Sequence, residues 1–141
     1  KVEPKGIKQV EVCENTVEFL KKDNTLWARG RGFRKKEKCS YQLRKIDSDV
    51  KEVCLPCKNK VLYVKKNSVA YGMGYSTALS FDFTDRYSKR YRGVWINKPV
   101  KLMKNVKHVY SGYYYKNAMF MTEDNDLYWV GSQGIAYLHW W

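Results

Sequence analysis

No apolar run in this sequence approaches the ~20 residues that a membrane-spanning helix requires. The longest runs, at residues 61–64 and 118–121, have the length of a strand. We therefore expect no transmembrane segment. The chain starts at Lys1 and shows no charged segment followed by an apolar one, so we expect a mature processed chain or a trimmed one.

Catalytic and metal-binding side chains are also scarce. The histidines are His108, inside an apolar strand-like segment, and His139, near the end of the sequence. Neither belongs to a Ser-His-Asp order, a pair of catalytic carboxylates or a cluster with metal-ligand spacing. The sequence therefore predicts a protein that is not an enzyme and that uses neither a cofactor nor a metal ion.

Acidic residues are few compared with basic ones. The 14 Asp and Glu residues against 27 Lys and Arg residues give a formal net charge of +13. A field of this sign attracts nucleic acid, acidic polymers, anionic membrane surfaces or acidic proteins. It is equally typical of a solvated basic surface, so the charge alone identifies no partner.

Apolar and aromatic residues are plentiful. They make up 44% and 16% of the 141 residues, a composition typical of one globular domain. Large amphipathic rings suit half-buried strands and binding surfaces alike. The composition favours a β-rich fold.

One sequence unit occurs three times. Residues 7–10, 50–53 and 106–109 share the opening Val/Ile-Lys-x-Val. In each copy an apolar run, a short polar turn, a second apolar run and a pair of glycines follow in the same order. The sequence therefore predicts a single all-β repeat domain over residues 1–141, with repeats at about 7–49, 50–105 and 106–141.

The core of each repeat has the pattern of a β-hairpin. Two apolar runs flank a polar turn, in which we expect Asn24, Asn67 and Asn125 to adopt positive φ, since Asn tolerates that region. The glycines after the second run, such as Gly72 and Gly74, are expected to end the strand. No helix follows these glycines, so a nucleotide-binding loop is not indicated.

The repeat resembles that of the regulator of chromosome condensation family. The resemblance rests on Val-Lys-x-Val, on a hairpin with Leu127-Tyr128-Trp129, and on the closing Gly-Ser-Gln-Gly at 131–134, with Gly112 after the first strand. The Asp-Gly turn typical of the family is replaced here by Asp-Asn or Lys-Asn. The resemblance implies one four-stranded β-propeller blade per repeat. Propellers of this kind have diverse functions, so the resemblance implies no particular site residues.

Three repeats are fewer than the about 4–8 blades of a closed propeller. Three arrangements are consistent with the sequence: a partial propeller belonging to a longer ring, a half-ring that forms a homodimer to complete the propeller, or a β-trefoil. The trefoil is the alternative fold because it accommodates three repeats in a chain of this length.

The four cysteines are Cys13, Cys39, Cys54 and Cys57. An even number of cysteines favours disulfides in a secreted protein, and four cysteines allow three pairings. Together with the missing methionine this favours an extracellular or cell-surface location; buried thiols are expected in a cytosolic protein. Cys54 and Cys57 form a C-x-x-C motif that we expect in a loop, without the helix of a redox site or a second close pair for zinc.

Two basic and aromatic stretches are the predicted binding residues, because Arg forks bind carboxylate or phosphate and aromatic rings stack. They are expected on loops, although solubilising loops have the same composition. The predicted residues are Arg29, Arg31, Phe33, Arg34, Lys35, Lys36, Lys89, Arg90, Tyr91 and Arg92.

The predicted function is recognition of a protein partner by a non-catalytic propeller-like scaffold. The alternative is a basic module that binds a polyanion, either nucleic acid or an acidic cell-surface polymer. Polyanion binding weakens steeply with salt, which distinguishes the two.

Overall fold

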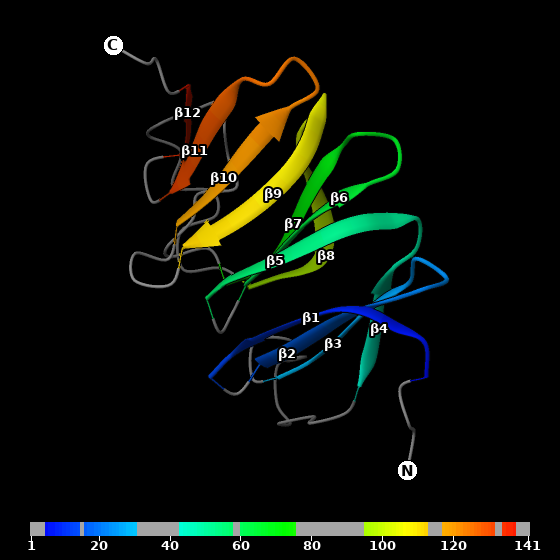
Figure 1. The fold of residues 1–141 in the computed structure, drawn as a ribbon. Coiled ribbons are helices and arrows are strands. Elements are labelled where there is room, and N and C mark those ends of the chain that lie inside the picture. The colour runs from blue at the N-terminus through cyan, green and yellow to red at the C-terminus, as the bar shows by residue number, and fades with distance from the viewer. Residues whose placement is uncertain are drawn as a thin grey trace.

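The computed structural model describes residues 5–14, 16–30, 43–57, 60–75, 95–112, 117–131 and 134–137. Strands dominate these residues and form three antiparallel four-stranded sheets (Figure 1). The first sheet contains β1 (Ile7–Cys13), β2 (Thr16–Lys21), β3 (Leu26–Arg29) and β4 (Arg44–Asp47). The second contains β5 (Val50–Cys57), β6 (Lys60–Lys65), β7 (Ala70–Tyr75) and β8 (Trp95–Met103). The third contains β9 (Val106–Gly112), β10 (Asn117–Thr122), β11 (Leu127–Gly131) and β12 (Gly134–Tyr137).

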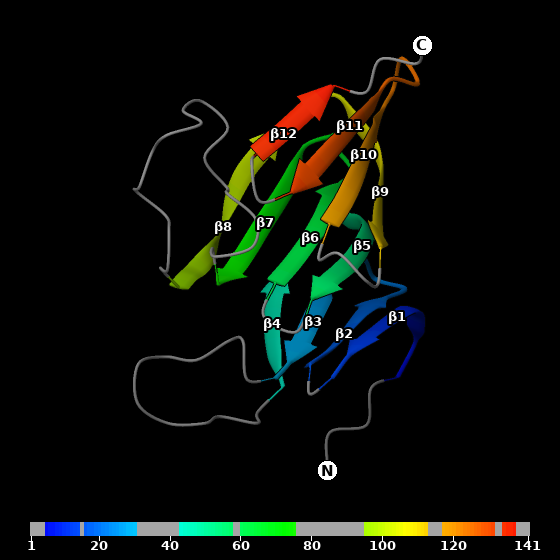
Figure 2. The same ribbon diagram turned by 90° about the vertical axis from the view of Figure 1, so that its left-hand side faces the viewer.

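Each repeat of the sequence forms one of these sheets. Within every sheet the strands follow one another in chain order, so that neighbours in sequence are neighbours in space. From the side, the sheets lie one above another, with the first lowest and the third highest (Figure 2). This is the arrangement of consecutive propeller blades, as predicted. The β-trefoil alternative is wrong, because the repeats build separate sheets rather than one shared barrel. No membrane-spanning helix is found in the part of the chain that the structure describes.

The hairpin turns owe their shape to a residue with positive φ. Asn24 has a φ of 61°, Asn125 has 65°, and in the second repeat Ser68 has 61°. The prediction of positive φ at Asn67 is therefore wrong by one position. The Asn67 side chain instead accepts a hydrogen bond from the Val69 N–H at 3.2 Å, which fixes the turn from within.

The glycines of the second repeat do not end their strand. Gly72 and Gly74 lie inside β7, which pairs with both β6 and β8. Gly74 has a φ of 119°, and the register with β8 shifts between the two glycines. A bulge needs a residue with this freedom, so the glycines bend the strand instead of stopping it.

The C-x-x-C segment lies in strand β5 and not in a loop as expected. Cys54 pairs with Leu62 and Cys57 pairs with Lys60, with a register shift between them. Pro56 lies inside this shifted segment, where the missing N–H of proline is tolerated. The apolar opening of the repeat therefore continues through the motif.

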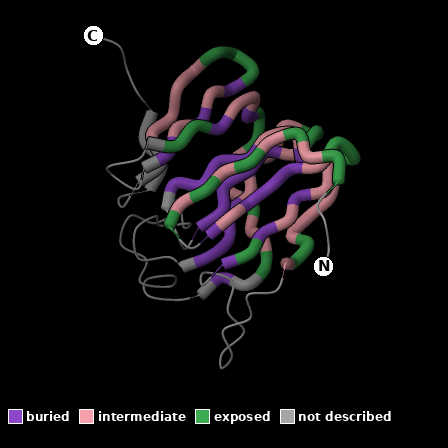
Figure 3. Tube along the Cα trace, turned by 60° about the horizontal axis from the view of Figure 1, so that its bottom comes forward, coloured by how far each residue is buried: buried purple, intermediate pink, exposed green. Residues whose placement is uncertain are grey.

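The core forms where the faces of neighbouring sheets meet. Alternate residues of a strand point to opposite faces, so β6 sends Val61 and Tyr63 toward the first sheet and Leu62 and Val64 toward the third. Buried positions accordingly concentrate on the strands in the middle of the molecule (Figure 3). Between the first and second sheets lie Leu20, Leu26, Ala28, Val50, Val53, Val61, Tyr63 and Met73. Between the second and third lie Cys54, Leu62, Val64, Ala70, Ile96, Val106, Val109, Ala118 and Phe120.

A backbone hydrogen bond also joins each sheet to the next. The Val50 N–H at the start of β5 donates to the Asn24 carbonyl at 3.0 Å, and the Val106 N–H at the start of β9 donates to the Ser68 carbonyl at 2.8 Å. Both acceptors are the turn residues with positive φ. The turn of one repeat therefore sets the position of the next repeat's first strand.

Asp47, at the end of the first sheet, receives two side chains of the second sheet. Tyr63 Oη donates to one carboxylate oxygen at 2.7 Å, and Lys65 Nζ lies 3.0 Å from the other. Burial by itself raises the pKa of Asp47, but the hydrogen bonds from Tyr63, Lys65 and the Ser48 N–H outweigh it and lower the pKa. Burial and the hydrogen bond to Asp47 raise the pKa of Tyr63.

Replacing Phe120 with alanine tests the packing of the second sheet on the third. Phe120 is fully buried, and truncating such a ring costs about 3–5 kcal/mol. We expect a loss of this size in the free energy of unfolding measured with urea. Lys101→Ala, at an exposed position of β8, is the control and is expected to change stability little. A loss below about 1 kcal/mol for Phe120→Ala contradicts the packing.

The Asp47 cluster predicts a pH dependence. A carboxyl whose pKa is lowered by folding stabilises the fold above its ordinary value of 3.8, and this contribution disappears as the pH falls through the folded-state pKa. The difference in unfolding free energy between the wild type and Asp47→Asn is therefore expected to be largest at neutral pH and to shrink in acid. A difference that stays constant from neutral pH to acid argues against the cluster.

Candidate binding groove

The first strands of the three sheets lie next to one another. β1 contacts β5, and β5 contacts β9, although they belong to different sheets (Figure 1). A groove with a volume of about 720 Å³ follows these strands. Its lining residues are Lys8, Gln9, Glu11, Lys51, Glu52, Val53, Cys54, Val109, Tyr110 and Ser111.

Gln9 joins the first and second sheets across this groove. Its side-chain amide donates to the Val53 carbonyl at 2.7 Å and to Glu11 Oε1 at 3.1 Å. The Val53 N–H in turn donates to Gln9 Oε1 at 3.4 Å. Gln9 thereby satisfies backbone groups on the open edge of β5, which no strand of another sheet covers within the described residues.

Glu52 holds the same place in the second repeat and joins the second sheet to the third. Its Oε1 accepts a hydrogen bond from the Val109 N–H at 3.0 Å, and its Oε2 lies 2.8 Å from His108 Nδ1. Since a carboxylate only accepts hydrogen bonds, Nδ1 is the nitrogen that carries the hydrogen. The variable position of Val/Ile-Lys-x-Val therefore has a defined role: its side chain contacts the first strand of the next sheet.

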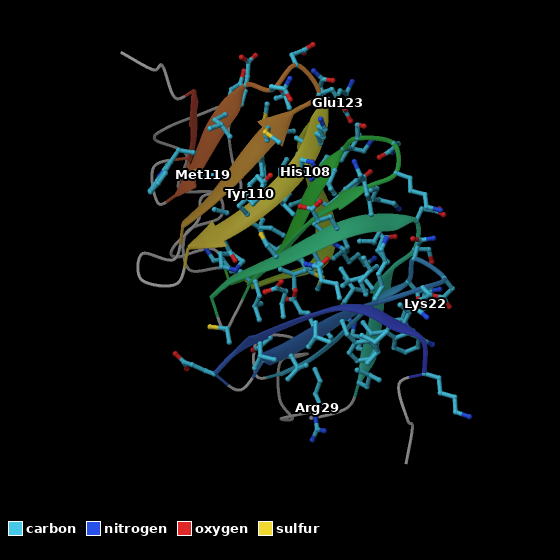
Figure 4. All side chains as sticks on the ribbon, viewed as in Figure 1. Lys22, Arg29, His108, Tyr110, Met119 and Glu123 are labelled. Carbon is cyan, nitrogen blue, oxygen red and sulfur yellow. The ribbon has the colours of Figure 1, made fainter. Side chains whose placement is uncertain are left out.

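The groove presents charges of both signs and one exposed ring. Lys8 is exposed, while Lys51 is half-buried and donates to the Lys107 carbonyl at 3.2 Å. Glu11 and Glu52 supply carboxylates. The Tyr110 side chain is 47% exposed, and its ring lies beside that of His108, with 6.0 Å between the centroids (Figure 4). The groove therefore combines hydrogen-bond donors, hydrogen-bond acceptors and an exposed aromatic ring.

Cys54 lines the groove as a buried thiol. Burial raises its pKa well above the ordinary value, and the carboxylates of Glu18, Glu11 and Glu52 add to this effect, while a hydrogen bond with Ser111 opposes it. Because the thiolate is the reactive form of cysteine, a protonated Cys54 is unsuited to redox or nucleophilic chemistry. No cluster of three potential metal ligands occurs among the described residues.

The expectation of disulfides among the four cysteines finds no support in the described part of the chain. Cys54 is a thiol in the structure and not half of a disulfide, and every complete pairing of the four cysteines needs it. Cys39 and the side chain of Cys57 lie outside the described part of the chain.

The predicted basic binding residues lie away from this groove or outside the residues that the structure describes. Arg29 ends β3 on the exposed side of the first sheet and is not part of the groove lining (Figure 4). The other nine predicted residues lie outside the described ranges and stay predictions; they are Arg31, Phe33, Arg34, Lys35, Lys36, Lys89, Arg90, Tyr91 and Arg92.

The groove residues themselves were missed in the sequence. The signal was present, because each opening has a polar residue between Lys and Val, and that Val is buried in the second and third openings. Its meaning depends on a neighbouring sheet that lies more than forty residues away, as the Gln9–Val53 contact shows. In the sequence of a single strand, this residue cannot be distinguished from a polar residue that faces solvent.

Glu52 variants test the contact between the second and third sheets. Glu52→Ala leaves the Val109 N–H without its acceptor, which is expected to cost about 1–3 kcal/mol of unfolding free energy in urea titrations. Glu52→Gln retains one acceptor oxygen and is expected to cost less. Equal losses for the two variants contradict the role given to the Val109 hydrogen bond.

Comparison with known proteins supports the fold. No protein-family model matches this sequence, and no curated protein is significantly similar to it. Among solved structures, Prp20p from Saccharomyces cerevisiae matches with a TM-score of 0.70 and 19% identity. Yeast RCC1 (Prp20), in a complex with Kap60, gives the same TM-score and identity.

The matches cover 92% and 93% of this chain but 32% and 31% of the yeast chains, so this chain spans about a third of the proteins it resembles. The likeness shows that the three sheets have the fold of propeller blades of the RCC1 kind.

Proposed function

We propose that this chain is a non-catalytic module that binds a protein partner at the groove along β1, β5 and β9. The fold supports this proposal, because its structural neighbours bind proteins: Prp20p is described with its binding properties to Gsp1p and histones, and yeast RCC1 in complex with Kap60. Burial raises the pKa of the Cys54 thiol, which argues against redox or nucleophilic chemistry at this residue of the groove.

The observation that carries the choice of surface is the groove itself. It combines lysines, carboxylates, the Ser111 hydroxyl and the partly exposed Tyr110 ring along three strand edges. Exposed tyrosine with surrounding polar groups is typical of protein-binding sites. A polypeptide segment of mixed charge can hydrogen-bond to the polar groups while covering the Tyr110 ring.

Photo-crosslinking tests the location of binding. A photoreactive phenylalanine replaces Ser111, which is exposed inside the groove, and in a control protein it replaces Lys101, which is exposed on β8. After irradiation in cells that express the protein, we expect a recurrent partner at position 111 and not at position 101. Identical crosslinking from the two positions contradicts binding at the groove.

Purified components then test the interaction directly. Lys51→Glu reverses a groove charge, and Lys101→Glu makes the same change outside the groove. We expect Lys51→Glu to change the affinity for the crosslinked partner about tenfold or more, and Lys101→Glu to leave it nearly unchanged, when both variants retain the wild-type circular dichroism spectrum. Equal affinities for the two variants contradict the proposal.

The polyanion alternative draws on the net charge of +13. Titration of the protein with a heparin fragment and with a DNA duplex at two salt concentrations tests it. Tight binding to either polymer that falls steeply with salt, together with no groove-dependent protein partner, favours the alternative.

A further inference from the structure

Two sheet faces of this molecule are covered by no other described sheet. The second sheet is covered on both sides, but the first and third sheets each have one face turned away from it. On the first sheet that face carries Val10 and Val12, which are 50% and 62% exposed. On the third sheet it carries Tyr110, Met119 and Met121, since Tyr110 pairs with Met119 in the register (Figure 4). Apolar residues dominate both end faces, and one polar or charged residue lies among them on each, Arg29 on the first sheet and His108 on the third.

The positions on the end face of the third sheet correspond to positions that are buried between sheets in the first and second repeats. Met121 holds the place of Leu20 in the first sheet and Val64 in the second, both fully buried against the following sheet. Leu127, its register partner, holds the place of Leu26 and Ala70, which are also fully buried. The same positions are only half-buried in the third sheet. The third sheet therefore presents the surface that receives a following sheet.

The positions on the end face of the first sheet correspond to positions that pack on the preceding sheet in the second and third repeats. Val10 holds the place of Val53 and Val109, which are 1% and 3% exposed against the preceding sheet. Phe19, its register partner, holds the place of Tyr63 and Phe120. The first sheet therefore presents the surface that packs on a preceding sheet.

The polar contacts of the two internal junctions have counterparts on these same faces. The carbonyls of Asn24 and Ser68 accept the N–H groups of Val50 and Val106, and the corresponding pair is the Asn125 carbonyl with the Ile7 N–H. Ser68 Oγ donates to Glu123 Oε1 at 2.8 Å, and the corresponding pair is Asn125 with Lys22.

The charges of the two ends are opposite. The third-sheet turn carries Glu123, Asp124 and Asp126, whereas the first-sheet turn carries Lys21, Lys22 and Asp23, so the formal charges of the two turns are −3 and +1. Glu123 and Lys22 occupy the same place in their hairpins and lie on the same side of the molecule (Figure 4). Opposite charges at matching turns favour the pairing of one end with the other.

We propose that two copies of this chain close into a six-bladed ring, in which the third sheet of each copy packs on the first sheet of the other. Six blades fall within the about 4–8 with which propellers close. Both junctions of the ring are equivalent and have the construction of the internal junctions. This proposal goes beyond the binding of a partner protein. Tyr110 corresponds to Cys54, which is buried between the second and third sheets, so the ring covers Tyr110 and leaves the other groove residues for a partner.

Native mass spectrometry and sedimentation velocity test the ring at concentrations up to about 100 µM. The expected mass is twice the 16.7 kDa of one chain. Met121→Glu, on the third-sheet face, and Val10→Glu, on the first-sheet face, are each expected to give monomers. Lys101→Gln changes the net charge by the same amount at an exposed position of β8 and is expected to remain dimeric. Circular dichroism identifies any variant that fails to fold, and Val10 is exposed enough to tolerate the change.

Mixing the two variants tests which faces meet. The intact third sheet of Val10→Glu can pack on the intact first sheet of Met121→Glu, so the mixture is expected to form heterodimers although each variant alone is monomeric. A monomeric wild type overturns the proposal, as does a mass other than twice the chain. Val10→Glu that remains dimeric also overturns it, because third sheets then pair with each other. None of these results bears on the Lys51→Glu affinity test of partner binding.

Discussion

The structure depends on the burial of apolar residues that lie on both faces of the second sheet. Strand β6 is apolar on both sides, and no single four-stranded sheet can bury such a strand in water. The second sheet solves the problem by packing Val61 and Tyr63 on the first sheet and Leu62 and Val64 on the third. The hydrogen bonds from Val50 and Val106 to the turns before them fix the spacing of the sheets. Packing and register thus act together to align the repeats.

The candidate groove is a consequence of the same stacking. Once the sheets are aligned, β1, β5 and β9 come together, and their open edges need hydrogen-bond partners. Gln9 and Glu52 provide these partners from the variable position of the repeat opening. The residues around them include the exposed Lys8 and Tyr110, which are available for recognition. Structural ties and candidate binding residues therefore share the same strands, with each role assigned by where the side chain points.

The sequence was sufficient for the fold but not for the site. Three matching copies of strand, turn and strand indicate repeating sheets, because independent segments rarely agree in order and spacing by chance. Residue-level details failed where they depend on a side-chain hydrogen bond or on the register between strands, which the apolar pattern does not show. Ser68 takes the positive φ because the Asn67 side chain bonds within the turn, and Gly74 forms a bulge against β8. The groove requires three distant strands at once, so no local pattern reveals it. The basic stretches were predicted as binding residues from their composition alone. Of these residues, only Arg29 lies in the described part of the chain.

Native-state hydrogen exchange tests the stacking of the three sheets most directly, because it measures the protection of individual amides. The N–H groups of Val50, Val106 and Val109 donate across sheets, whereas that of Met121 lies within the third sheet. Stacked sheets predict that the three junction amides are protected nearly as strongly as the amides inside each sheet. Junction amides that exchange as fast as those of an unfolded peptide, while the amides within the sheets stay protected, contradict the account.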